Sequence, residues 1–317
     1  MDQPAAPDAS PAISPTESVS TATIAPPQKP FMHRAFLSDE GLRSGWSVLL
    51  YLLMVAAVGI AFGFLLRIAH PGKFSQLWGM SLTEVFSLVA VVIPALVMAK
   101  VEKRPFGAYG LPKTGAFGRL FWLGMLWGIV ALTVLMVAMR AAGAFYFGGL
   151  ALHGMRMAKF AAFWMVFFIV VGLFEEFLLR GYTQFTLTRG IGFWPTALLL
   201  SFAFGAIHLG NEGEDKVGAL GAAIIGLFFC LTLRRTGNLW FAVGLHASWD
   251  WGETFLFSVP NSGLVAPGHM LNSSFQGPRW LTGGSVGPEA SIFVFIVMAL
   301  MWVIFHFMYR EKKYLVP

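Results

Sequence analysis

The stretch FAAFWMVFFIVVGLFEEFLLRGY, residues 160–182, combines a long apolar run with three ionisable side chains. An apolar helix of about 20 residues crosses the hydrocarbon core of a bilayer. A helix that ended at Phe174, so that Glu175 met water, would span about 22 Å and fall short of the core. Because the apolar run resumes at Phe177, the stretch predicts a membrane-spanning helix that carries polar groups within it.

The composition of the whole chain indicates the same class of protein. Of its 317 residues, 56% are hydrophobic and 12% are charged, whereas about a quarter of a soluble protein is charged. With one cysteine, Cys230, the chain cannot form an intrachain disulfide. We therefore expect an all-α, polytopic integral membrane protein. We attribute its net charge of +6 to basic loops that face anionic lipid, and we expect no nucleic-acid partner.

About eight transmembrane helices are predicted from the apolar runs and the Gly, Pro and charged breaks between them. The transmembrane domain covers residues 31–317, and the Pro-, Ala-, Ser- and Thr-rich residues 1–30 are predicted to be a disordered tail. Small residues at a four-residue spacing in the sixth run let another helix approach closely. The predicted spans are 46–66, 82–99, 119–139, 160–188, 193–209, 217–234, 238–257 and 290–308.

The Lys and Arg residues predict the orientation in the membrane. Fourteen of the 22 lie on the side that holds both termini, seven lie on the other side, and Arg180 lies inside a span. Since cytoplasmic loops carry an excess of Lys and Arg, both termini are expected in the cytoplasm.

Ionisable residues are concentrated in three of the eight predicted spans. A charged group at the bilayer centre costs at least about 2.5–3.5 kcal/mol, so such groups face a protein interior or a water-filled cavity. On a helix, Glu176 and Arg180 share a face and can pair, whereas Glu175 points about 100° away. Glu175 is thus free to face a cavity, where it can act as a base.

Two further spans contribute polar residues at a matching depth. Phe204 and His208 end the fifth span, and His246 and Asp250 lie four residues apart in the seventh. Counting 1.5 Å per residue from the cytoplasmic ends, Glu175, His208, His246 and Asp250 fall roughly 15–22 Å deep. The four side chains are therefore expected in one layer.

These motifs, in this order on three hydrophobic spans, resemble those of the CAAX prenyl endopeptidase and bacteriocin-processing (CPBP, or Abi) family of intramembrane proteases. The motif-bearing core covers residues 160–257, and the family has an eight-helix architecture. The resemblance implies an endopeptidase that cleaves a membrane-associated or lipid-modified protein or peptide. It also implies roles for individual residues: Glu175 activates a water with help from His208, His246 and Asp250 bind the oxyanion, and Glu176 and Arg180 support the geometry.

One position departs from the family pattern, which ends in Asn where this chain has Asp250. An ionised Asp accepts but cannot donate a hydrogen bond, so Asp250 must be protonated, orient His246 or ligate a metal. Glu175, His208 and His246 form a possible zinc set. No His-Glu-x-x-His motif accompanies them, which favours a metal-free mechanism and leaves zinc as the alternative.

Two other functions remain open at this stage. A proton- or cation-coupled transporter also places carboxylates and histidines inside the membrane. A catalytically silent scaffold or immunity protein would keep the family's core without its reaction.

Overall fold

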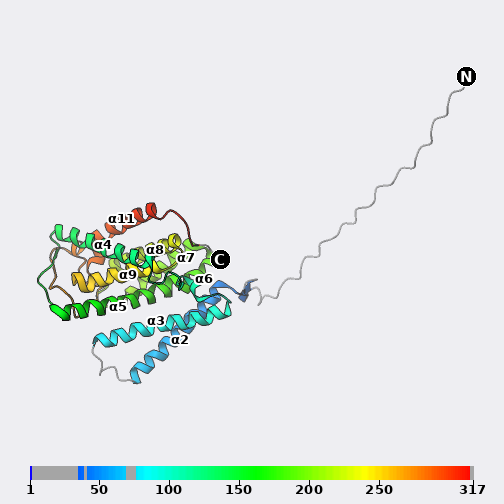
Figure 1. Cartoon of the computed structure of the whole chain (residues 1–317), viewed down its shortest axis with the longest axis horizontal. Helices are drawn as coiled ribbons and strands as arrows, with labels where there is room; N and C mark the ends of the chain where they lie inside the picture. The colour runs from blue at the N-terminus through cyan, green and yellow to red at the C-terminus, as the bar shows by residue number, and fades with distance from the viewer. Residues whose placement is uncertain (2–34, 39–40, 69–75, 315–317) are drawn as a thin grey trace.

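The computed structural model describes residue 1 and residues 35–38, 41–68 and 76–314, which form a bundle of helices (Figure 1). Residues 2–30 of the predicted tail lie outside the described residues. Helices occupy all eight stretches that were predicted to span the membrane. The chain is thus a polytopic, helical integral membrane protein, as its composition predicts.

Five of the described helices are long and apolar enough to cross a membrane, namely α2 (Ser44–Ile68), α3 (Gln76–Val101), α4 (Arg119–Ala141), α8 (Lys216–Thr236) and the continuous stretch Gly154–Ile191. The helices α7 (Phe193–His208) and α11 (Ile292–Met308) are apolar but shorter. The predicted seventh span consists of α9 (Trp240–Trp251) and the π-helical segment η4 (Gly252–Phe257). The remaining elements are short: β1 (Leu37–Ser38), β2 (Gly41–Leu42), η2 (Phe106–Tyr109), β3 (Phe145–Tyr146), β4 (Ser274–Phe275), α10 (Arg279–Thr282) and η5 (Pro288–Ala290).

The fourth predicted span, 160–188, is not one uninterrupted helix. It comprises α5 (Gly154–Leu178), the π-helical segment η3 (Leu179–Thr183) and α6 (Gln184–Ile191). The break is at Gly181, whose ψ of −122° is not helical. A Cβ at this position would lie 2.6 Å from the ring of Phe177, so the turn needs glycine. Hydropathy does not register such a break, because the apolar pattern continues through it.

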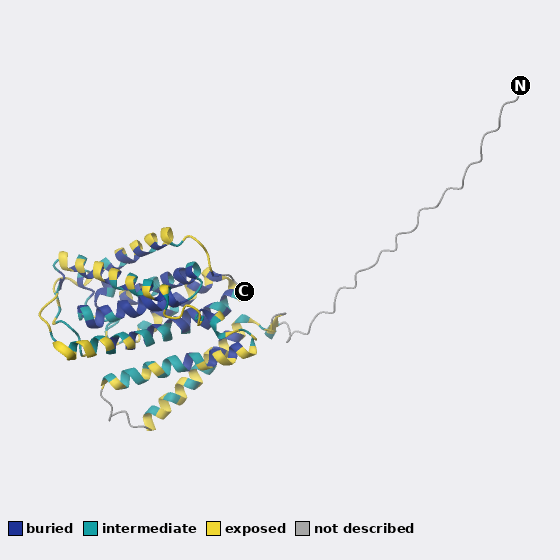
Figure 2. Cartoon of the chain, viewed as in Figure 1, coloured by how far each residue is buried: buried dark blue, intermediate teal, exposed yellow. Residues whose placement is uncertain are grey.

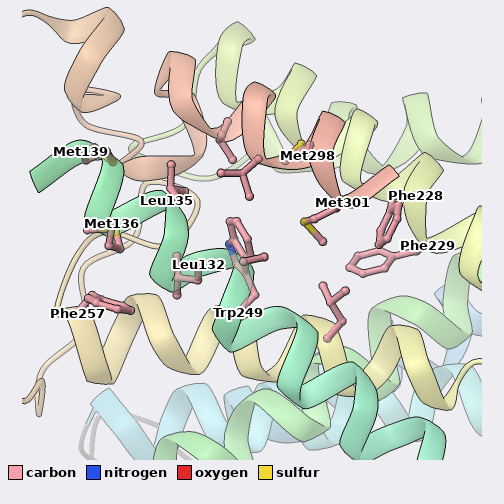
Figure 3. Packing of buried hydrophobic residues seen from close by; sticks show 14 of the residues in the cluster. Leu132, Leu135, Met136, Met139, Phe228, Phe229, Trp249, Phe257, Met298 and Met301 are labelled. Atoms are coloured by element: carbon pink, nitrogen blue, oxygen red, sulfur yellow. The ribbon is translucent and has the colours of Figure 1, made fainter. Parts of the chain in front are cut away.

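Helix α9 forms the centre of the bundle, and every residue from Trp240 to Asp250 is buried (Figure 2). The largest hydrophobic cluster joins it to α4, α8 and α11. Figure 3 shows Leu132 and Met136 of α4, Trp249 of α9, and Met298 and Met301 of α11 gathered in this cluster. A central helix surrounded in this way holds its polar side chains in fixed positions.

Helices α4 and α9 approach each other closely through glycine. A Cβ added to Gly124 would overlap the carbonyl oxygen of Phe241, and one added to Gly244 would overlap that of Phe121. The small residues of the sixth span lie on α8, where α7 packs against it: Ala222 contacts the cluster that includes Leu200 and Phe204 of α7. Gly205 of α7 lies against Ala219 and Ala223, and Gly226 lies beside both Phe204 and the Arg180 side chain of η3.

Helices α2 and α3 lie side by side at one edge of the bundle (Figure 1). The partly buried Glu102, directly after the end of α3, attaches this pair to the rest of the molecule. Its carboxylate accepts hydrogen bonds from Tyr182 Oη at 2.5 Å, Tyr109 Oη at 2.9 Å and Arg189 Nη2 at 3.0 Å. One charged group thus connects α3 with η2, η3 and α6.

The glycine contact between α4 and α9 leads to a prediction about stability. We expect Gly124→Ala to destabilise the protein by about 1–3 kcal/mol, because the new methyl group overlaps backbone that cannot move independently. Thermal unfolding in detergent measures the effect. The matched control is Gly59→Ala on α2, where nothing lies within 4 Å of the added Cβ. Equal melting temperatures for the two variants would contradict the prediction.

Candidate active site

A cavity of about 220 Å³ opens among α3, α5, α7, α8 and α9, and part of its lining comes from the segment that follows η4. The four side chains predicted to form one polar layer, Glu175, His208, His246 and Asp250, all line it. The cavity also has residues that the sequence analysis did not select: Glu84, Asn211, Asn261, Ser262 and Glu289. Glu84 lies within an apolar run and was detectable by that signal, whereas the others lie in loops or short turns without periodicity.

The two neighbouring glutamates have different environments. Glu176 is fully buried, and its Oε1 lies 3.2 Å from Arg180 Nη1, which is the ion pair predicted from their four-residue spacing. The same oxygen lies 3.1 Å from Nδ1 of His246. Glu176 therefore connects η3 with α9 and orients the imidazole ring of His246.

The guanidinium of Arg180 lies against two aromatic rings and fills space left free by a glycine. Its Cζ lies 4.3 Å from the ring centroid of Phe204 on α7 and 5.6 Å from that of Phe229 on α8. Gly226 leaves the space that the group fills, since a Cβ there would overlap Nη2. Arg180 has no exposed surface, so it supports the site from behind without lining the cavity.

Glu175 faces the cavity, with a quarter of its side-chain surface exposed. Its Oε2 has no hydrogen-bond partner and lies 3.7 Å from Nε2 of His246, too far for a direct hydrogen bond. That oxygen is itself buried, and the exposed part of the side chain lines the cavity.

Both ring nitrogens of His246 lie close to carboxyl groups. Nδ1 faces Glu176, while Nε2 lies 3.5 Å from Asp250 Oδ2 and points toward the cavity side where Glu175 lies. The ring of Phe229 stacks on the imidazole at a centroid distance of 5.4 Å and an interplanar angle of 18°. His246 therefore presents Nε2 to the cavity in a fixed orientation.

His208 enters the cavity from the end of α7. Its Nδ1 lies 2.8 Å from the carbonyl oxygen of Phe204, which assigns the proton of a neutral ring to Nδ1. The other nitrogen, Nε2, is then an acceptor that faces away from this contact. The structure brings His208 to the same cavity as Glu175, and the ring is hydrogen-bonded to its own helix through Nδ1.

The side chains do not fit the zinc alternative. Within the described ranges, no three His, Cys, Asp or Glu side chains are grouped so that they could hold a metal ion. No step of the reaction is therefore derived through a metal.

The helices that supply the site match a known family. Residues 157–252, from α5 to the start of η4, match the family model described as type II CAAX prenyl endopeptidase Rce1-like. This segment is Rce1-like. The resemblance identified from the three motifs is thereby confirmed, and the segment is similar to the core of CAAX-type intramembrane proteases. Neither the curated proteins nor the solved structures contain a match to the chain.

The buried pair of the Rce1-like segment leads to a second prediction. Replacing one partner leaves the other charge uncompensated, so Arg180→Ala should lower the unfolding free energy by about 3–5 kcal/mol. Adding Glu176→Gln removes the orphaned charge and should restore part of the loss. Thermal and denaturant unfolding in detergent measure both variants.

A surface pair serves as the control. Lys313→Ala disrupts the exposed contact with Glu311 and should change stability by at most about 1 kcal/mol. If Arg180→Ala were no more destabilising than Lys313→Ala, the supporting role of the buried pair would be wrong.

Proposed function

We propose that the protein is an intramembrane endopeptidase that hydrolyses a peptide bond with a water activated by Glu175. The observation that carries this proposal is the contrast between two adjacent carboxylates. Glu176 is committed to Arg180 and His246, whereas Glu175 lines the cavity and forms no ion pair with a described Lys or Arg. A carboxylate that lines the cavity without such a partner, beside a fully engaged neighbour, suits proton abstraction from water.

In the proposed reaction, water sits between Glu175 and His246 and is oriented with the help of His208. Glu175 takes a proton from the water as the water oxygen attacks the scissile carbonyl carbon. When the tetrahedral intermediate collapses and its C–N bond breaks, that proton passes from Glu175 to the nitrogen of the leaving amine. His246 acts as an imidazolium: its Nδ1–H is held by Glu176, and its Nε2–H donates to the developing oxyanion. Fixed donors of this kind stabilise the transition state without having to reorganise.

Asp250 takes the place of the amide that the family pattern has. We propose that it acts in its protonated form, donating to the oxyanion beside His246 Nε2, from which its Oδ2 is 3.5 Å distant. In the resting state the same oxygen helps to orient the imidazole. An ionised Asp250 would oppose the oxyanion, so the reaction requires the proton on this carboxyl group.

The substrate is proposed to be a membrane-tethered or lipid-modified protein or peptide, because the cavity lies among bilayer-spanning helices. Both termini are proposed to lie in the cytoplasm, on the side that carries the excess of Lys and Arg.

A transporter is the second candidate, favoured by one observation. The helix that carries Arg180 is interrupted by η3, and broken helices are a feature of ion sites in transporters. Uptake into vesicles that depends on a proton gradient and requires Glu175 would support this candidate. A silent scaffold would instead keep its biological function when Glu175 and His208 are substituted.

The first test of the peptidase uses Glu175→Ala. Purified protein in detergent is incubated with a mixed peptide library, and the products are identified by mass spectrometry. We expect cleavage by the wild type and a loss of at least about 100-fold in the variant, since a general base typically contributes 10²–10⁴. Wild-type cleavage should also persist in a strong chelator.

Glu311→Gln is the matched control, because Glu311 is a highly exposed carboxylate distant in sequence from the site. It should cleave as the wild type does. Undiminished cleavage by a folded Glu175→Ala protein would disprove the mechanism.

Asp250 provides a separate test of the oxyanion contact. Asp250→Asn should keep cleavage within about tenfold of the wild type, because the amide donates without needing an added proton. Asp250→Leu should lose at least about 100-fold, the usual cost of removing an oxyanion donor. Initial rates measured from acid to alkaline pH add a second readout: the Asn variant should retain activity at alkaline pH where the wild type declines. Parallel pH profiles would exclude the protonated role.

A further inference from the structure

The cavity has acidic side chains that the hydrolytic mechanism does not use. Four carboxyl groups line it, from Glu84, Glu175, Asp250 and Glu289, together with two histidines, and the described lining contains no Lys or Arg. Arg180 is sealed behind the site and is paired with Glu176. Glu175 and Asp250 have roles in the proposed reaction, whereas Glu84 and Glu289 have none.

Glu289 is held in position rather than free to move. The backbone N–H of Ser262 donates to its Oε2 at 2.6 Å, and the Ser262 hydroxyl donates to the same oxygen at 2.8 Å. No ion pair of Glu289 with another described residue is present. A carboxylate that is fixed by neutral donors at the wall of a cavity can receive a cation without reorganising.

Two further acids adjoin Glu289. Glu253 is fully buried, and neither of its oxygens makes a well-formed hydrogen bond, although the Trp249 side chain lies close enough to interact. In the loop after α7, burial and the repulsion of Glu289 raise the pKa of Glu214 to about 7. A fixed carboxylate in a cavity whose described lining has no Lys or Arg is stabilised by a ligand of positive charge.

We propose that Glu289 marks a subsite for a basic side chain, Lys or Arg, next to the scissile bond of the substrate. This inference rests on the proposed peptidase function and names a feature of its substrate. The apolar part of the cavity lining, which includes Trp249, Leu264 and Met298, accommodates the methylene stem of such a side chain, and the carboxylate receives its charged end. A substrate carboxylate is disfavoured here, because it would add a further negative charge.

Two arguments favour a side chain over an inorganic cation. The described acids are not grouped in a way that could hold a metal ion. A single ammonium or guanidinium group needs one fixed carboxylate and forms its remaining hydrogen bonds with neighbouring neutral groups, of which Asn261 and Ser262 line the same cavity.

The test compares peptides that differ at one position. In a peptide that the wild type cleaves, the residue on either side of the scissile bond is made Lys, norleucine or Glu, and kcat/KM is measured. We expect Lys to exceed norleucine by about tenfold or more, since a hydrogen bond to a charged group contributes at least that factor, and Glu to be poorest. In Glu289→Gln, which keeps an acceptor for Ser262, the Lys/norleucine ratio should fall below about threefold.

Glu311→Gln is again the control and should keep the wild-type ratio. Equal ratios in the wild type and Glu289→Gln, or a wild type that prefers norleucine or Glu, would overturn the subsite.

Binding separates this inference from the peptidase proposal. Peptides with one Lys moved along an apolar sequence are titrated against Glu175→Gln, and against the same protein with Glu289→Gln added. Tighter binding of a Lys peptide than of its norleucine partner, lost in the double variant, supports the subsite even if no peptide is cleaved and the peptidase proposal fails. Equal binding of the Lys and norleucine peptides overturns the subsite. Binding of Ca²⁺ or Mg²⁺ that requires Glu289, while Lys peptides bind no better than norleucine peptides, also overturns it.

Discussion

The site depends on one buried carboxylate oxygen, Oε1 of Glu176, which lies within hydrogen-bond distance of both Arg180 and His246. A charge taken out of water must be paired, so the position of each partner is determined by the other two. Because the three residues come from α5, η3 and α9, the contact determines how these segments pack. The same contact also fixes the imidazole ring of His246, which faces the cavity, and the orientation of the polar layer follows from this contact.

Much of this arrangement is encoded in short-range sequence patterns. Hydropathy located the eight helical stretches because each must match either the bilayer or the bundle interior. The pair of Glu176 and Arg180 was predictable because residues four apart share a helix face. The common layer of Glu175, His208, His246 and Asp250 was predictable from helical rise alone, since every residue adds the same 1.5 Å.

The features that the sequence did not predict arise from contacts between distant segments. The contact of His246 with Glu176 joins positions 70 residues apart, and no local spacing encodes it. Glu289 lies in a three-residue turn after a Gly-, Pro- and Ser-rich segment, where there is no periodicity to indicate what it faces. The break at Gly181 was missed for a related reason, because a helix and a π-helical turn have nearly the same apolar pattern.

The space beside Gly226 has an evolutionary consequence. It is filled by the guanidinium of Arg180, so any side chain at position 226 and a long cation at position 180 exclude each other on this backbone. Neither position can drift alone: enlarging residue 226 displaces the cation, and shortening residue 180 leaves both a void and an unpaired acid. In a lineage of such chains the two sites should change together or remain fixed together, although they lie 46 residues apart and neither touches a substrate.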